Sequence, residues 1–238
     1  MVYQPIVRVS DNKIVSIEAL MRLSDDRYSS TSPESLITMA EKYGLYKKMS
    51  KCIVHKSLHD FSFLVSASSN LLLSLNVSGV DILDDSYLKH LRLTCKLYSI
   101  PLSRIKLEIS ERCDADIKKI SLFCDRAKLL GFLISIDDFG KGYSNIHWLL
   151  DMRYDEVKID KYLVSKLSDC DAGEYFIPIV MKLINDGVDV VFEGVETEEQ
   201  MTQIKSLSSN FLVQGWFTGK PLEVEYIIYA LNGNKCQL

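Results

Sequence analysis

The feature that most constrains the fold is a regular alternation of short apolar segments with longer amphipathic ones. The apolar segments are rich in Val, Ile, Leu and Phe and are bounded by polar residues or Gly, which is typical of buried strands. We predict strands over Val2–Val9, Lys13–Met21, Leu71–Val77, Arg104–Ile109, Phe132–Ile136, Glu156–Ile159, Asp189–Phe192 and Phe211–Gln214.

Helical patterns lie between most of these strands. One opens at Ser32, with Ser as the N-cap and Pro33 in the first turn. Several end in a glycine, at Gly44, Gly131 and Gly187. The other predicted helices lie near Tyr46–Ser62, Asp84–Tyr98, Asp114–Leu130, Tyr175–Asp186 and Thr197–Leu207.

This alternation of strands and helices implies a parallel sheet covered by helices. Eight strands in a chain of 238 residues fit a closed barrel better than an open, doubly wound sheet. Only Ser10–Asn12 separate the first two strands, which suits a hairpin and not a crossover. We therefore predict an α/β fold, a modified (βα)8 TIM-like barrel with an antiparallel first strand, as a single domain over residues 1–238.

Composition narrows the functional classes. The net charge is −4, and no run of Lys or Arg forms a patch, which argues against DNA binding. No apolar run approaches the roughly 20 residues that a membrane span needs. The six cysteines include no CxxC pair, and we interpret them as reduced thiols of a cytoplasmic protein. Because a strand pattern follows Met1 at once, we expect an excised module of a longer protein or a short variant without its first helix. If it is a module, the expected setting is the cytoplasmic part of a larger, membrane-attached protein.

Polar side chains gather at the carboxyl ends of the predicted strands. In a barrel these ends converge on one face, where barrel active sites lie. A single acid at a strand end is usually a cap or a solvated loop residue, but so many together indicate a site. The residues are Glu18, Asn76, Glu108, Glu111, Asp137, Asp138, Lys158, Asp160, Glu193 and Glu196.

So many carboxylates in one place would repel one another and raise one another's pKa, unless a cation lies between them. Oxygen ligands without His or Cys favour Mg²⁺ or Mn²⁺ over Zn²⁺. Two cations would suit the number of ligands, and a two-metal site can hold both the attacking and the leaving oxygen of a phosphoryl displacement. We therefore predict a two-metal site for a phosphate ester.

The motifs of the chain, taken in order, resemble those of the EAL-domain family. They are Tyr3–Ile6, Ile17–Arg22, Leu75–Ser78, Leu107–Glu111, Asp137–Gly140, Val157–Asp160, Phe192–Thr197 and Gln214–Phe217. The resemblance spans nearly the whole chain. It implies a barrel with an antiparallel first strand and a bacterial phosphodiesterase that hydrolyses cyclic di-GMP, a second messenger, to linear pGpG.

The resemblance also implies a role for each site residue. Lys158 resembles the lysine that orients the attacking water, and Glu193 resembles a general base or metal ligand. The first metal ion would be held by Glu18, Asn76, Glu108 and Asp137, and the second by Asp138 and Asp160. The substrate would contact Gln4 and Arg22, with Leu20 and Gln214 beside the nucleotide. Glu111 and Glu196 would support the loop after strand five and the wall of the site.

One position departs from the family pattern. Lys141 stands where the family usually has Thr or another small residue. In the family this loop, which follows Asp138, links the second metal ion to a homodimer interface. We expect Lys141 either to weaken that link or to point to solvent.

Two other functions stay open on the sequence. A non-catalytic EAL-like receptor or docking module would bind cyclic di-GMP without cleaving it, although such relatives usually lack a metal ligand that is present here. A different metal-dependent barrel enzyme, such as a lyase, is also compatible with a barrel, because a fold does not fix a function. Trp216 and Phe217 could stack on a guanine, but we expect them to pack against the end of the barrel.

Overall fold

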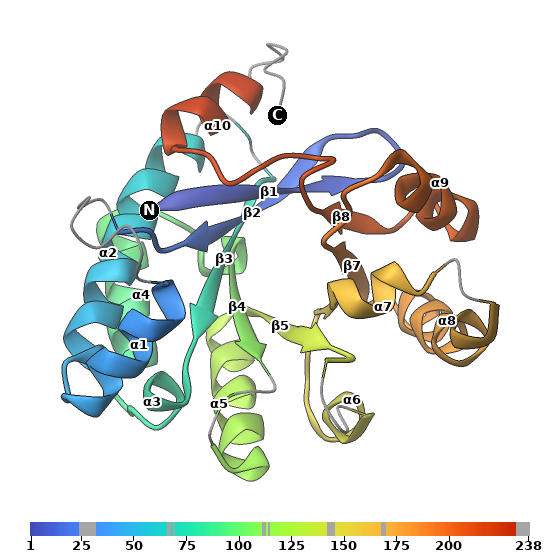
Figure 1. Cartoon of the computed structure of the whole chain (residues 1–238). Coiled ribbons are helices and arrows are strands. Elements are labelled where there is room, and N and C mark those ends of the chain that lie inside the picture. Colours follow the sequence, from blue (N-terminus) through green and yellow to red (C-terminus); the bar gives the residue numbers. More distant parts are fainter. Residues whose placement is uncertain are drawn as a thin grey trace.

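The computed structural model describes residues 1–23, 32–65, 68, 70–110, 113, 115–141, 146–167 and 170–231. Its centre is a closed barrel in which eight strands pair in sequence order. Figure 1 shows the strands in the middle of the molecule with the helices arranged around them. The predicted TIM-like barrel is therefore confirmed.

All eight predicted strands are present, with ends that differ by at most three residues. The strands are β1 Val2–Arg8, β2 Ile14–Leu20, β3 Leu72–Val77, β4 Ile105–Ser110, β5 Leu133–Phe139, β6 Glu156–Ile159, β7 Asp189–Glu193 and β8 Leu212–Gln214. The largest difference is in β5, which continues three residues beyond its predicted end at Ile136.

The antiparallel first strand is also confirmed. β1 pairs with β2 in one antiparallel ladder and with β8 in another, so it closes the barrel. The remaining neighbours, from β2 round to β8, are parallel. The carboxyl ends of β2 to β8 therefore meet at one end of the barrel, which we call the mouth.

The helices surround the strands. The longer ones lie close to their predicted positions, and Ser32 caps α1 by accepting a hydrogen bond from the Ser35 amide. Four short helices, α3, α6, α7 and α10, were not predicted. The helices are α1 Pro33–Lys42, α2 Tyr46–Val65, α3 Gly79–Ile82, α4 Tyr87–Leu97, α5 Ile117–Leu130, α6 Ile146–Asp151, α7 Lys161–Ser165, α8 Cys170–Asn185, α9 Glu198–Leu207 and α10 Val224–Leu231, with a 3₁₀ turn at Leu102–Arg104.

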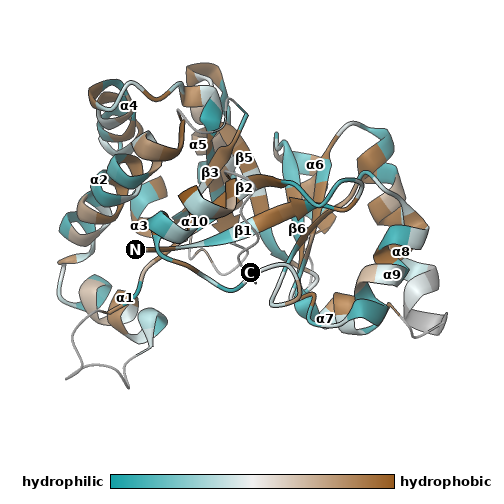
Figure 2. Ribbon diagram, turned by 90° about the horizontal axis from the view of Figure 1, so that it is seen from above, coloured by the Kyte–Doolittle hydropathy of each residue, from teal (hydrophilic) through white to brown (hydrophobic). Residues whose placement is uncertain are grey.

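The hydrophobic core lies mainly between the barrel and its helices. Figure 2 shows much brown, the apolar end of the scale, on the strands, and helices along which brown and teal residues alternate. The large core cluster includes side chains from the outer faces of the strands, such as Leu73, Leu107 and Ile134, all fully buried. In the described part of the chain, no helix is long and apolar enough to pass through a membrane.

Inside the barrel, by contrast, much of the packing is polar. Strand residues two apart lie on the same face, so each strand presents alternate residues to the interior. Below the mouth, the Lys106 ammonium donates to Glu156, and Ser135 donates to the same carboxylate at 2.9 Å. One layer nearer the mouth come Glu108 and Lys158, each two residues further along its strand. Because of this two-residue period, several carboxylates lie together in the barrel interior just below the mouth.

Candidate active site

The mouth of the barrel contains a cavity of about 340 Å³. Side chains and backbone from strands on both sides of the barrel line it, together with the loops that follow β5 to β8. The lining residues are Gln4, Glu18, Leu20, Asp138, Lys141, Asp160, Lys161, Glu193, Gly194, Glu196, Gln214, Gly215 and Trp216.

Strand register brings the polar residues together. Asn76 of β3 lies directly opposite Glu108 of β4. On the other side of the barrel, Glu193 of β7 lies opposite Gln214 of β8. Because side chains at the same level of neighbouring parallel strands project to the same face, each pair enters the mouth at a common height.

An irregularity in β5 places two adjacent aspartates at the mouth. Consecutive strand residues normally point to opposite faces. Between Ile136 and Phe139 the pairing of β5 with β6 shifts register, and Asp138 has a left-handed backbone with a φ of 58°. Such bulges redirect side chains and are common next to active sites. Asp137 therefore reaches the inner carboxylates while Asp138 still lines the cavity.

Lys158 is the centre of the inner site. Its side chain is 1% exposed, and its Nζ lies 3.1 Å from Glu18 Oε2 and 3.1 Å from Glu108 Oε2. The same Nζ is 3.3 Å from Asp137 Oδ1 and 2.8 Å from Glu193 Oε1. One ammonium thus forms ion pairs with four carboxylates from four different strands. The carboxylates raise the pKa of Lys158 well above its usual value, although burial opposes this, so the lysine stays charged.

Glu18 is the best satisfied of these carboxylates. Asn76 Nδ2 donates to its Oε1 at 2.9 Å, and Gln214 Nε2 donates to its Oε2 at 2.7 Å. Burial alone would raise the pKa of Glu18, but the charge of Lys158 and the two amide donors outweigh it and lower the pKa. Glu18 is therefore ionised at neutral pH.

The other three carboxylates, those of Glu108, Asp137 and Glu193, are not fully neutralised by the positive charge around them. Burial, reinforced by the neighbouring Glu18, raises the pKa of Glu108 well above its usual value. Burial likewise raises the pKa of Asp137, and it raises that of Glu193 to about 8 despite Lys158. Within the described part of the chain, Glu108 Oε1 is buried without a hydrogen bond, and Asp137 Oδ1 is buried with no hydrogen bond beyond its 3.3 Å ion pair with Lys158. An additional cation would satisfy these oxygens and favour the ionised forms.

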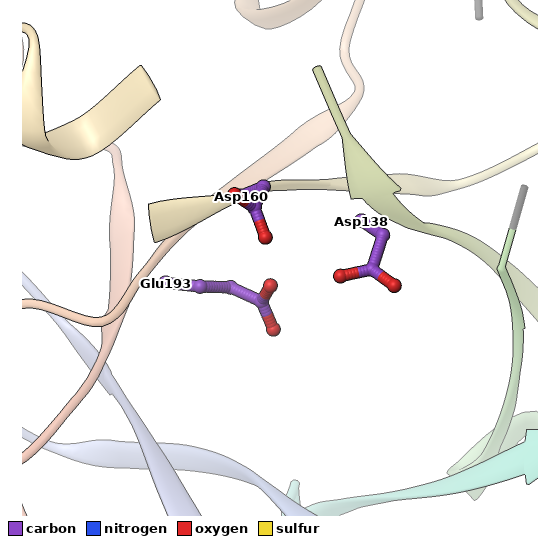
Figure 3. Close-up of side chains that lie close together, drawn as sticks. All are labelled: Asp138, Asp160 and Glu193. Carbon is purple, nitrogen blue, oxygen red and sulfur yellow. The ribbon is translucent and has the colours of Figure 1, made fainter. Parts of the chain in front are cut away.

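A second carboxylate group lies toward the cavity. Asp138, Asp160 and Glu193 each offer an oxygen, and these three oxygens lie within 4.8 Å of one another. Figure 3 shows the three carboxylates converging on one point. Asp160 caps α7, its Oδ1 accepting from the Tyr162 amide at 2.8 Å. Glu193 belongs to both groups, because it also contacts Lys158. Such oxygen-only clusters are suited to hard divalent cations.

Comparison with known proteins agrees with this architecture. The family model for the EAL domain matches residues 1–221. The chain belongs to the EAL-domain family. It is 30% identical over 223 residues to the probable cyclic di-GMP phosphodiesterase PdeB of Escherichia coli, covering 94% of this chain and 42% of that protein. The chain thus spans less than half the length of this relative.

Solved EAL structures have the same fold as this EAL domain. The EAL enzyme Bd1971, bound to cAMP and cyclic di-GMP, superposes with a TM-score of 0.88 at 25% identity, over 97% of this chain and 64% of that one. The PaMucR phosphodiesterase in complex with cyclic di-GMP superposes with a TM-score of 0.85 at 26% identity, over 95% and 92% of the two chains. The shared fold therefore includes structures in which the nucleotide is bound.

The structure of this EAL domain places most of the remaining predicted residues at the cavity. Gln4, Leu20 and Glu196 line it, and the Gln4 side chain donates to the Gly219 carbonyl at 3.2 Å. Arg22 is exposed, does not line the cavity, and donates to the neighbouring Met21 carbonyl at 2.8 Å. Glu111 lies outside the described residues.

The expected packing of Trp216 and Phe217 against the barrel end is wrong. Trp216 is 61% exposed and Phe217 is 43% exposed, and Trp216 lines the cavity. The Lys220 ammonium lies 5.2 Å from the centre of the Trp216 ring, within the range of a cation–π contact. The indole therefore forms an open, apolar wall of the site.

Two residues, Ser110 and Lys141, donate hydrogen bonds to Asp138 but were not predicted as partners of this carboxylate. Ser110, the last residue of β4, donates to Asp138 Oδ2 at 3.2 Å. Its position at the end of a predicted strand could have indicated that it lies at the mouth of the barrel. Lys141 does not point to solvent, as one of the two expectations had it, because its Nζ contacts Asp138.

Proposed function

We propose that this EAL domain is a metal-dependent phosphodiesterase that hydrolyses cyclic di-GMP to linear pGpG. The observation that carries the proposal is the contact of Lys158 with four carboxylates, three of which have raised pKa values. The names of the relatives support the substrate, since PdeB is a probable cyclic di-GMP phosphodiesterase and PaMucR was solved with that nucleotide.

The residues fit a pair of Mg²⁺ or Mn²⁺ ions. Glu18, Glu108 and Asp137 surround one position, and Asn76, whose Nδ2 donates to Glu18, would offer its amide oxygen. Asp138 and Asp160 would hold the second ion, with Glu193 beside both. When bound, such ions polarise the phosphodiester and lower the pKa of a coordinated water. The donor set contains only oxygen, which suits these two metals.

The protein's own groups then act on the water and the phosphate. We assign Glu193 as the general base, because its carboxylate contacts Lys158 and also belongs to the group formed with Asp138 and Asp160, so it lies beside both proposed ions. Lys158, fixed by four carboxylates, would orient the water and offset charge that develops on the phosphate. Gln4, Leu20, Trp216 and Gln214 form the wall beside which a nucleotide would lie, while Arg22 would have to turn inward to reach a phosphate.

The test is turnover of cyclic di-GMP by the purified protein with Mg²⁺ or Mn²⁺, followed as the release of pGpG. Glu18→Ala and Glu193→Gln should each abolish release. Asp189→Asn is the matched control, because Asp189 lies at the opposite end of the barrel and should leave turnover intact. If the wild-type protein leaves the substrate uncleaved while an active EAL enzyme consumes it, the proposal fails. Tight calorimetric binding of the nucleotide without turnover would instead identify a receptor.

We also propose a homodimer formed through the loop after Asp138. Residues 142–145 of this loop lie outside the described part of the chain. The support comes from α6, which follows the loop and exposes Ile146 and Leu150 at 56% and 79%. Sedimentation equilibrium should give twice the chain mass of 27.1 kDa, and Leu150→Glu should return a monomer. A wild-type protein that stays monomeric at high concentration would contradict the dimer.

A further inference from the structure

Lys141 places a positive charge on the carboxylates assigned to the second metal ion. Its Nζ lies 2.9 Å from Asp138 Oδ1 and 3.5 Å from Asp160 Oδ2. These are two of the three carboxylates that converge in Figure 3. An ammonium within this distance of both aspartates lies where a divalent cation would be bound by them.

The backbone explains why Lys141 reaches this point. The Lys141 amide donates to the Asp138 carbonyl at 3.1 Å, which closes a tight turn. Inside this turn Gly140 has a φ of 96°, and a Cβ at Gly140 would lie only 2.2 Å from Leu163 Cδ1. The turn is therefore restricted to glycine at position 140. It holds the Lys141 backbone next to Asp138, so that the Lys141 ammonium contacts the Asp138 carboxylate. The ion pair between Lys141 and Asp138 thus depends on two features: the backbone of this turn, and a lysine at position 141.

We propose that Lys141 is an internal cation that competes with the second divalent metal ion for Asp138 and Asp160. The proposal rests on the metal sites assigned under the proposed function. The domain would bind one divalent ion at the inner carboxylates and a second one only when the Lys141 side chain moves out. That side chain is 35% exposed, so an outward position in solvent is open to it.

The effect on affinity follows from the competition. An ammonium and a divalent ion at the same two aspartates repel each other, so each weakens the binding of the other. If Lys141 occupies the aspartates for nine-tenths of the time, the apparent affinity for the second ion falls about tenfold. The first ion is less affected, because Lys141 has no described ion pair with Glu18, Glu108 or Asp137.

Lys161 provides a matched control. It lines the same cavity and carries the same charge, but it forms no ion pair with any residue that the structure describes. Replacing Lys161 therefore removes one positive charge from the cavity without releasing Asp138 or Asp160.

The experiment measures Mn²⁺ binding to the whole chain by calorimetry, without nucleotide. Magnetic coupling between bound Mn²⁺ ions is followed by electron paramagnetic resonance as a second measurement. We expect the wild type to bind one ion tightly and a second about tenfold or more weakly. Lys141→Met should tighten the second site by about tenfold and produce coupled ions at lower Mn²⁺ concentration. Lys141→Arg and Lys161→Met should behave like the wild type.

The outcomes separate this inference from the proposed function. Equal second-site affinity in the wild type and Lys141→Met would overturn the inference, as would an equal gain in Lys161→Met. Absence of Mn²⁺ binding in both proteins would overturn the inference together with the metal assignment. If Lys141→Met binds the second ion more tightly, but neither it nor the wild type cleaves cyclic di-GMP with both sites filled, the proposed function fails and the competition stands.

Discussion

At the scale of single residues, Lys158 stabilises the barrel interior as well as serving the proposed chemistry. It is the one lysine in contact with Glu18, Glu108, Asp137 and Glu193 among the described ion pairs. Removal of one partner from a buried ion pair costs about 3–5 kcal/mol, because the remaining charge stays buried. We expect Lys158→Met to lose about this much unfolding free energy at pH 8, and less at pH 5, where the carboxylates can take up protons.

Urea unfolding at the two pH values measures this prediction. The exposed Lys161→Met should change the unfolding free energy by less than about 0.5 kcal/mol. A Lys158→Met protein as stable as the wild type at pH 8 would show that the four carboxylates are already neutral or solvated. Added Mn²⁺ should restore part of the loss, since a cation would then replace the ammonium.

The raised carboxylate pKa values predict how metal binding depends on pH. In the metal-free protein Glu193, with a pKa of about 8, is largely protonated at pH 7, and the pKa values of Glu108 and Asp137 are also raised. A metal ion must displace these protons, so Mn²⁺ affinity should increase as the pH rises toward and past 8, by about tenfold per pH unit for each proton released. Calorimetry in buffers of different ionisation enthalpy counts the protons. Glu193→Gln should lower the count, and an affinity that is flat between pH 6 and 8 would contradict the prediction.

At the scale of elements, the sequence predicts the strands better than the connections. Each strand is a short segment rich in Val, Ile, Leu and Phe and bounded by polar residues or Gly, and this pattern can be recognised without knowledge of the fold. Helices such as α3 and α7 have only four and five residues, too few to show a helical period. The positions of Glu18, Glu108 and Glu193 followed from strand ends, but the bulge that turns Asp138 into the cavity depends on pairing between β5 and β6. The exposure of Trp216 depends on the path of the chain after β8.

The close packing of Gly215, just after β8, against Val195, just after β7, predicts the effect of a substitution at Gly215 on the ends of both strands. A Cβ on Gly215 would lie 2.1 Å from the Val195 carbonyl oxygen and 2.3 Å from the Val195 nitrogen, so the backbone itself would have to move. Since Gly215 directly follows Gln214, which pairs with Glu193 in the sheet, Gly215→Ala should separate the ends of β7 and β8. We expect a loss of about 1–3 kcal/mol in stability, together with weaker Mn²⁺ binding.

Gly187→Ala is the control for this substitution. Gly187 has a φ of 81°, and no atom lies within 4 Å of the position that a Cβ would take. Alanine there should therefore cost about 1–2 kcal/mol through backbone strain alone. Thermal unfolding and Mn²⁺ calorimetry on both variants separate the two effects. Gly215→Ala with unchanged metal affinity would show that the close approach of these two segments does not position the site.

At the scale of the whole molecule, the site joins nearly every strand of the barrel. The proposed metal ligands come from β2, β3, β4, β5 and β7 and from Asp160 after β6, so a bound ion links segments far apart in the sequence. A ligand that binds only the folded chain stabilises it by about 2.7 kcal/mol at one hundred times its dissociation constant. For a chain of this size we expect Mn²⁺ to raise Tm by about 5–10 °C. Glu18→Ala should lose the shift, whereas Asp189→Asn, at the far end of the barrel, should keep it. An equal shift in Glu18→Ala would place the stabilising ion elsewhere on the molecule.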